Sequence, residues 1–267
     1  MAYKIYLFDA LNAVEWSQVA WKLEGRKVSL EDCTRERIHD VMLRHLPKDG
    51  LIVDAGCGVA RWPIFLRRVG YQVVGVEYDH EACKIAKEND PGLGVLRADV
   101  RGTPFKDESV DAIISLGVVE HDEAGPLQAL DEAYRILKPN GLLILAVPYN
   151  NLWRRLFMNH VLTLVTGKRR RAGWKLGFAE YRFTKPEVRS FLTQTRFNVM
   201  SDHPNDLDPP KNMGLWVDYN NIFMNPFRKL GVEELFILPG IKGRLAALAT
   251  RFFPWVVCGE VVFVARK

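Results

Sequence analysis

The sequence predicts an α/β protein organised around a doubly wound, mostly parallel sheet. Apolar runs with strand character alternate along residues 51–147 with stretches of helical periodicity, a pattern typical of parallel strands joined by crossover helices. A Gly-x-Gly turn follows the first run, and an acidic residue ends each of the first three runs or lies close to the end. In such sheets the carboxyl ends of the strands meet at one edge, where ligands bind.

The first strand and its glycine turn organise the rest of the chain. The apolar run Leu51–Val53 ends in Asp54, the turn Gly56–Gly58 follows, and a helical pattern extends over 62–69. Glycine allows a positive φ and the close approach of a ligand, and the start of a helix favours negatively charged groups. The pyrophosphate-binding sequence Gly-x-Gly-x-x-Gly would need a third glycine where Arg61 stands. The sequence therefore argues against a nicotinamide-dependent oxidoreductase, which we keep only as an alternative.

Four further apolar runs complete the predicted parallel part of the sheet. The second run ends in Glu77, which lies 21 positions after Gly56. This spacing is expected of a carboxylate that accepts hydrogen bonds from ribose hydroxyls. The four strands are predicted at 72–77, 95–100, 110–116 and 141–148, with connecting helices at 80–89 and 124–137.

Five motifs in a fixed order resemble those of the class I S-adenosylmethionine-dependent methyltransferases, in particular small-molecule enzymes such as those of quinone biosynthesis. The motifs are V-D-A-G-C-G from Val53, G-V-E from Gly75, R-A-D-V from Arg97, P-F-K-D-E-S-V-D from Pro104 and R-I-L-K-P-N-G from Arg135. The resemblance covers about 46–149 and, more weakly, 181–199. One departure is that the family's third loop glycine is Ala60 here.

The resemblance implies a Rossmann-like methyltransferase fold with seven strands, closed by an antiparallel pair at 197–200 and 261–265. It also implies S-adenosylmethionine as cofactor and S-adenosylhomocysteine as product. The loop backbone and Asp54 would then hold the methionine part, Glu77 the ribose, and Asp99 the adenine amino group. The predicted cofactor-binding residues are Asp54, Gly56, Cys57, Gly58, Glu77, Tyr78, Asp99, Val100 and Leu116.

The acceptor is expected above the ends of the fourth and fifth strands. A sulfonium methyl group is already electrophilic, so the reaction requires no metal ion, and we predict no metal site. If the acceptor is a hydroxyl, it needs a base with a pKa near neutrality, and His121 fits best; a structural contact at the strand end is the alternative. We predict His121, Glu120 and Tyr149 as catalytic residues, and Asp122, His160 and Tyr181 as further polar candidates.

We predict a single methyltransferase domain over 1–267. It comprises a helical N-terminal cap (1–46), a cofactor-binding core (47–150), a basic cap insertion (151–180), and the C-terminal part of the sheet (181–267) with an insertion at 203–259. Within the N-terminal cap, helical periodicity covers 10–25 and 29–46, and Ser29 is a candidate N-cap. This cap either covers the cofactor or only packs on the core. Thr184 and Glu187 predict a capping box for a helix that ends near Thr195.

Two insertions suggest contact with an anionic partner. The segment 151–179 has no acidic residue and seven basic ones, namely Arg154, Arg155, Lys168, Arg169, Arg170, Arg171 and Lys175. It indicates a lid for an acceptor with an apolar body and a negative group, an acidic membrane surface, or only a solvated loop. Ile241, Leu245, Leu248 and Phe252 share one helical face. A cap helix packed on the sheet is favoured there over an interfacial helix.

Composition narrows the remaining choices. The net charge of +5 is too small by itself to indicate a nucleic-acid partner. The basic run 168–171 leaves an RNA methyltransferase as an alternative, but no Asn-Pro-Pro-Tyr-like run follows the fourth strand and no added RNA-binding module is visible. The four cysteines have no zinc or disulfide spacing and suggest a reducing compartment. No leader-like start or membrane-length apolar run is present, so we expect a cytoplasmic protein with peripheral membrane contact as an option. A non-catalytic cofactor-binding or peripheral-membrane protein is another alternative, and the oligomeric state stays open.

Overall fold

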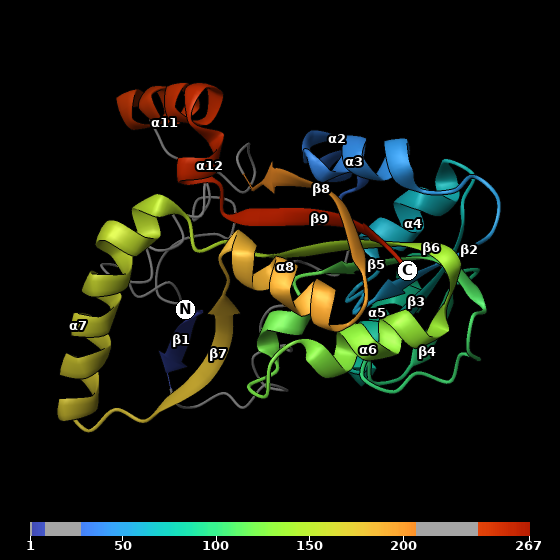
Figure 1. Cartoon of the computed structure of the whole chain (residues 1–267), viewed down its shortest axis with the longest axis horizontal. Coiled ribbons are helices and arrows are strands. Elements are labelled where there is room, and N and C mark those ends of the chain that lie inside the picture. Colours follow the sequence, from blue (N-terminus) through green and yellow to red (C-terminus); the bar gives the residue numbers. More distant parts are fainter. Residues whose placement is uncertain (1, 9–27, 207–239) are drawn as a thin grey trace.

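The computed structural model describes residues 2–8, 28–206 and 240–267. The helix predicted at 10–25 and much of the insertion predicted at 203–259 lie outside these residues. Figure 1 shows a central sheet with helices on both of its faces, and further elements beyond one end of it.

The central sheet has seven strands. They are β2 (Leu51–Ala55), β3 (Gln72–Glu77), β4 (Gly94–Arg97), β5 (Val110–Leu116), β6 (Leu137–Pro148), β8 (Asn198–Asn205) and β9 (Glu260–Arg266). Their spatial order is β4-β3-β2-β5-β6-β9-β8. Strand β9 is antiparallel to both of its neighbours, and every other pair in this sheet is parallel. The predicted seven-stranded fold with a closing antiparallel pair is thus confirmed.

The other described elements are the helices that cover the two faces of the sheet and the elements outside the central sheet. The helices over the sheet are α2 (Leu30–Arg35), α3 (Ile38–His45), α4 (Arg61–Arg68), α5 (His80–Asn89), α6 (Leu127–Ile136) and α8 (Lys185–Gln194). The remaining elements are β1 (Tyr3–Phe8), β7 (Leu176–Arg182), the short helices η1 (Val119–His121) and η2 (Arg154–Met158), and α7 (Asn159–Arg171), α11 (Gly240–Phe252) and α12 (Pro254–Val257).

Neighbouring residues of the central strands point to opposite faces of the sheet, and both faces are buried. Ile113 packs in the cluster that includes α6 and α8, whereas Ile114 packs in the cluster that includes α2, α3 and α4. Leu143 and Ile144 divide in the same way. Because both faces are covered, these strands are continuous apolar runs, which is why the sequence locates them well.

Several predicted boundaries differ from the structure. The helix predicted at 124–137 begins only at Leu127, because a turn with Gly125 at positive φ precedes it. The third predicted strand ends at Arg97. The stretch 29–46 forms two helices, because Glu36 has extended backbone between them, and Ser29 makes no side-chain capping bond. The α5 helix and the capping box of Thr184 at α8 are confirmed.

A second, two-stranded sheet was not predicted. Strand β1 pairs antiparallel with β7, so that Tyr3 lies opposite Arg182. The Tyr3 hydroxyl also donates a hydrogen bond of 2.8 Å to the Asn159 carbonyl at the start of α7. The beginning of the chain is therefore a strand anchored to the 151–180 insertion, and the predicted N-terminal cap is not helical throughout.

The two insertions also differ from expectation. The basic run 168–171, which could have been a solvated loop, is the last turn of α7. In α11 the four apolar residues predicted to share a face are exposed. The favoured prediction, a helix that packs this face on the sheet, is therefore wrong.

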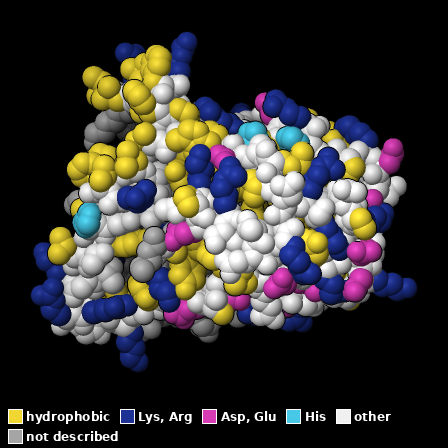
Figure 2. Space-filling view, viewed as in Figure 1, with side chains coloured by type: hydrophobic (Ala, Val, Ile, Leu, Met, Phe, Trp, Pro, Cys, Tyr) yellow, Lys and Arg dark blue, Asp and Glu magenta, His cyan; other side chains and the backbone are white. Residues whose placement is uncertain are grey.

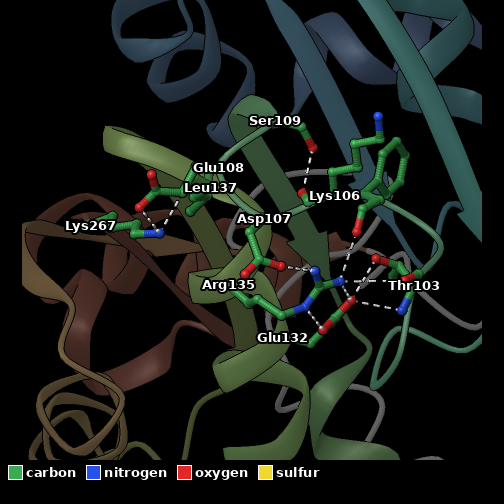
Figure 3. Close-up of polar contacts among 10 residues, drawn as sticks. Thr103, Lys106, Asp107, Glu108, Ser109, Glu132, Arg135, Leu137 and Lys267 are labelled. Atoms are coloured by element: carbon green, nitrogen blue, oxygen red, sulfur yellow. Dashed lines mark hydrogen bonds and ion pairs between the residues drawn. The ribbon is translucent and has the colours of Figure 1, made fainter.

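The loop before β5 is fixed by a network of polar contacts, drawn in Figure 3. The Arg135 guanidinium on α6 donates to the Phe105 carbonyl (2.9 Å) and to both carboxylate oxygens of Glu132. Glu132 in turn accepts from the Thr103 backbone N–H (2.7 Å) and hydroxyl (2.6 Å). At the far end of the loop, the Lys267 ammonium pairs with Glu108 at 3.2 Å. These contacts hold the 103–109 loop against α6 and the end of the chain.

Candidate functional site

The glycine loop follows β2, at the point where the order of the parallel strands reverses. Strand β2 has β3 on one side and β5 on the other, and ligands of doubly wound sheets bind at this position. Gly56 has a φ of 85°, and a Cβ atom there would lie 2.3 Å from the Val118 side chain. Only glycine therefore fits, and the loops after β2 and β5 meet in van der Waals contact.

The N–H groups of this loop are already used inside the protein. Gly56 and Cys57 both donate to the Val76 carbonyl, at 2.8 and 3.0 Å, and Gly58 donates to a carboxylate oxygen of Glu77 at 2.9 Å. A dinucleotide-binding loop directs such groups at a pyrophosphate. The arrangement therefore disfavours a nicotinamide dinucleotide and suits a ligand that carries no phosphate.

Ala60 replaces the third loop glycine without a change of backbone. Its φ of 65° lies in the left-handed region, as a glycine's would. For a residue with a Cβ atom this conformation costs roughly 1–2 kcal/mol. The short alanine side chain is buried and packs with Ile64 and Leu93, so the packing offsets that cost.

Glu77 is held in place by three backbone N–H groups. One carboxylate oxygen accepts from Tyr78 and Asp79, each at 2.8 Å, and the other accepts from Gly58. Burial raises the pKa of Glu77, and these hydrogen bonds oppose part of the shift. A carboxylate has about four acceptor positions. About one therefore remains for a ligand hydroxyl, without loss of an internal bond.

Asp54 lies buried next to Glu77. Burial raises the pKa of Asp54 to about 7, the Glu77 carboxylate adds to the shift, and Arg61 opposes it. Two acidic groups therefore share one buried place, where a positively charged ligand group would be stabilised. The chemistry of this pair fits a cation.

The residues predicted around an adenine ring lie at the same edge, but one of them already has a partner. Both carboxylate oxygens of Asp99 accept from the Arg101 guanidinium, at distances down to 2.7 Å, and Arg101 also bonds Asp122 at 3.0 Å. Leu116 packs against the core, and the Tyr78 side chain is about half exposed. Arg101 was not predicted as a site residue, since nothing local in the sequence marks it.

Cys57 can contribute only through its backbone. A Cβ atom on Gly75 would lie 2.5 Å from the Cys57 sulfur, so the side chain points at β3. Burial raises the pKa of this thiol well above its usual value. Val100 lies on the loop after β4, partly buried against the core.

Glu120 and His121 form the second part of the candidate site. The Glu120 side chain is 2% exposed, and one of its carboxylate oxygens has no hydrogen-bond partner among the residues that the structure describes. Burial raises the pKa of Glu120 to about 8, against the opposing effect of His121. The other carboxylate oxygen lies 3.9 Å from His121 Nε2. The pair is therefore a buried acid beside an imidazole.

The orientation of His121 is fixed by β7. Its Nδ1 atom donates to the Ala179 carbonyl at 2.7 Å, because a carbonyl can only accept, and this leaves Nε2 for other partners. Burial lowers the pKa of His121, but the Glu120 and Glu180 carboxylates and the Ala179 carbonyl outweigh it and leave the pKa raised. Glu180 was not predicted, because only the fold of β7 brings it here.

The other polar candidates make their contacts elsewhere or are exposed. The Tyr181 hydroxyl donates to the Glu123 carbonyl at 2.9 Å, and Asp122 bonds Arg101. The Tyr149 ring packs edge-on against Trp255 at 6.0 Å, and burial raises the pKa of its hydroxyl. His160 is exposed on α7. Within the described part of the chain, none of these four makes a polar contact with Glu120 or His121.

Comparison with known proteins finds similarity to methyltransferases over part of the chain. Residues 53–145 match the family described as "Methyltransferase domain". Demethylmenaquinone methyltransferase of Paenarthrobacter aurescens is 30% identical over 48% of this chain and 51% of its own length. The tRNA (carboxymethyluridine(34)-5-O)-methyltransferase of Arabidopsis thaliana is 34% identical over 39% of this chain and 26% of its own length.

The overall fold has counterparts among solved structures. An S-adenosylmethionine-dependent methyltransferase of Methanosarcina mazei superimposes with a TM-score of 0.56 at 18% identity, over 85% of this chain and 96% of that one. At this identity the likeness concerns the fold. The chain spans about half or less of the length of the curated relatives it matches.

Proposed function

We propose that this chain, whose core is a class I S-adenosylmethionine-dependent methyltransferase domain, transfers a methyl group to an oxygen or carbon atom of a small or lipid-like acceptor. One observation carries the proposal: the Glu77 carboxylate at the end of β3 is tied to the Gly56–Gly58 loop by the Gly58 N–H. This supports Glu77 as an acceptor for ribose hydroxyls, beside a loop whose amides already bond within the protein. S-adenosylmethionine, when bound, supplies an electrophilic methyl group on a sulfonium.

The buried acids fit the charge of this cofactor. S-adenosylmethionine is a cation at its sulfur and carries an ammonium group, and Asp54 and Glu77 lie together where it would bind. We assign Asp54 and the loop backbone to the methionine part and Glu77 to the ribose. Tyr78, Asp99, Val100 and Leu116 remain the adenine candidates. The chain's task is then to align the acceptor atom with the methyl group and to exclude water.

His121 is our candidate for the group that takes the acceptor's proton. With Nδ1–H held by the Ala179 carbonyl, Nε2 carries the free lone pair and can accept a proton from a hydroxyl. The Glu120 carboxyl, 3.9 Å from Nε2, would stabilise the imidazolium that results. Tyr149 stays a weaker candidate, since its ring packs against Trp255.

Calorimetric titration of the purified chain with S-adenosylmethionine, S-adenosylhomocysteine and NAD tests the proposal. We expect the first two ligands to bind and NAD not to bind. Glu77→Gln should weaken both at least about tenfold, because it removes a charge-assisted hydrogen bond. Glu81→Gln, an exposed change on the neighbouring helix, serves as the control. A folded protein that binds neither methyl ligand would contradict the proposal.

A tRNA acceptor is the second candidate, because a tRNA methyltransferase is among the relatives and α7 ends in four basic residues. Methyl-transfer assays with total tRNA and with demethylated quinones separate the two acceptors. Cofactor binding without transfer to any acceptor would instead favour a non-catalytic protein on the same scaffold.

A further inference from the structure

Two segments of the insertions contain basic residues and no acidic ones, so the net positive charge of the molecule lies in them. Residues 151–179 and 240–259 contain ten of the 37 Lys and Arg residues and none of the 32 Asp and Glu residues. The rest of the chain is left with 27 basic against 32 acidic residues and is net negative. An excess confined to two segments marks a surface for a negatively charged partner.

In the first insertion, an apolar line along the helix continues into a basic end. Trp153, Phe157 and Leu164 follow one another at helical spacing and are exposed by 39, 52 and 63%. The same line continues through Lys168 and Arg171, which are also exposed. The Trp153 and Phe157 rings lie against each other at 4.6 Å. This side of η2 and α7 faces away from the core with large apolar groups at one end and cations at the other.

The second insertion repeats this character on α11. Ile241, Leu245, Leu248 and Phe252 lie on one face and are 52–74% exposed. Arg244 and Arg251, also exposed, lie beside this face. Leaving such side chains in water is unfavourable, by roughly 25 cal/mol for each Å² of apolar surface. An apolar face with a basic border is typical of helices that lie in a membrane interface.

Contacts at their bases join the two insertions. The Asn151 side chain donates to the Cys258 carbonyl at 3.0 Å, and the buried Arg154 donates to the Gly259 carbonyl at 2.8 Å. The start of η2 is thereby tied to the chain that follows α12. Figure 2 shows hydrophobic side chains over α11 and the neighbouring end of α7, and Lys and Arg side chains over the far end of α7. We call the exposed apolar and basic side chains of η2, α7 and α11 described above the cap surface.

We propose that the cap surface docks onto an anionic lipid membrane. The exposed apolar side chains would enter the interface, and the basic end of α7 with Arg244 and Arg251 would face acidic headgroups. The chain would lie on the membrane, since the described residues contain no helix long and apolar enough to cross one. The proposal does not depend on the proposed methyl transfer.

Other occupants fit this surface less well. A second copy of the chain would bring two surfaces of the same positive charge together, which is unfavourable. A nucleic acid would leave the aliphatic face of α11 without a matching partner, since it contacts proteins through phosphates and polar base edges. A membrane offers an apolar interior bordered by negative charge, which matches both parts of the cap surface.

Sedimentation of the full chain with lipid vesicles tests the proposal. Vesicles of phosphatidylcholine alone are compared with vesicles containing roughly a third phosphatidylserine. We expect binding to the anionic vesicles at low salt, with at least about tenfold weaker binding to the neutral vesicles and at high salt.

Paired variants separate the two contributions. Leu245→Ser with Leu248→Ser should reduce vesicle binding about tenfold or more, while the exposed Val69→Ser with Leu127→Ser, far from the cap surface, should not. Lys168→Ser, Arg170→Ser and Arg171→Ser together should remove the preference for anionic vesicles. Arg68→Ser, Lys84→Ser and Lys106→Ser, equally exposed and equal in charge, should retain it.

Two outcomes would overturn the proposal. One is the absence of binding to anionic vesicles at low salt by a protein whose thermal unfolding shows that it is folded. The other is a dimer in solution that the Leu245 and Leu248 changes dissociate, which would assign the surface to a second copy. In both cases the calorimetric titration still reports on the methyltransferase proposal, so the two can fail separately.

Discussion

Glu132 on α6 and Glu120 on η1 are both buried acids, but their surroundings are opposite. Glu132 accepts hydrogen bonds from Thr103 and Arg135 at both oxygens, and although burial raises its pKa, these partners outweigh that and leave it lowered. Glu120 has one oxygen without a partner among the described residues, and burial raises its pKa to about 8. Glu132 therefore holds a loop in the folded state. Glu120 lowers the stability of the folded state, and we expect it to interact with a bound ligand.

The largest expected effect concerns the Glu120 side of this contrast, where His121 is the proposed base. His121→Gln should lower kcat about 10²- to 10⁴-fold, the usual contribution of a general base. The affinity for S-adenosylhomocysteine should be unchanged, because His121 lies outside the predicted cofactor residues. The exposed His160→Gln is the control. Full kcat in the His121 variant at every pH would exclude the base role and leave a structural contact with Ala179.

Loss of the Glu132 charge should instead lower the stability of the fold. Glu132→Gln removes the charge that holds Arg135 and Thr103, and we expect a loss of about 2–3 kcal/mol in the free energy of unfolding. This figure is reduced because Arg135 is about one third exposed. Urea unfolding measures the loss, with the exposed Glu88→Gln as control. Unchanged stability would mean that the network in Figure 3 contributes specificity but no net energy.

The two acids should also respond to pH in opposite directions. The pKa of Glu132 is lowered on folding, so its stabilisation is present above the unfolded value and is lost as the solution becomes acidic. The pKa of Glu120 is raised to about 8, so the fold loses stability as the pH rises from about 5 to about 8. Glu120→Gln should remove about 1–2 kcal/mol of this alkaline loss. Thermal unfolding at pH 6 and pH 8 measures it; equal pH curves for variant and parent would contradict the raised pKa.

The smallest effect concerns Asp54. Its pKa of about 7 should fall when a cation binds beside it, so binding of S-adenosylmethionine should release a proton. Affinity should then rise up to about tenfold as the pH increases from 6 to 8. Titrations in buffers of different ionisation enthalpy measure the proton. The exposed Asp49→Asn should leave the release intact, and a proton still released by Asp54→Asn would assign it to another group.

The sequence predicts the part of this molecule that depends on neighbouring residues in the chain. Apolar runs buried on both faces, the Thr184 capping box and the Gly56 turn each follow from a few adjacent residues, and all three are found in the structure. The acid at Glu77 lies beside the loop as its spacing indicates. Its role with a cofactor stays a prediction.

What the sequence does not predict depends on contacts between distant residues. Nothing near Arg101 shows that it will join Asp99 to Asp122, and nothing near Glu180 shows that β7 will bring it to His121. The prediction that the apolar face of α11 packs on the sheet was wrong for the same reason. A periodic pattern identifies the face of a helix but not the surface on which the face lies.

The pairing of β1 with β7 has a consequence for synthesis of the chain. Tyr3 leaves the ribosome well before Arg182, its partner in the two-stranded sheet. At about 5–20 residues per second, β1 waits on the order of 10–40 s for β7. During that time it is a strand with an unpaired edge, which other chains can join. Molecular chaperones that shield the nascent chain should therefore raise the yield of folded protein more than they do for a variant lacking this strand.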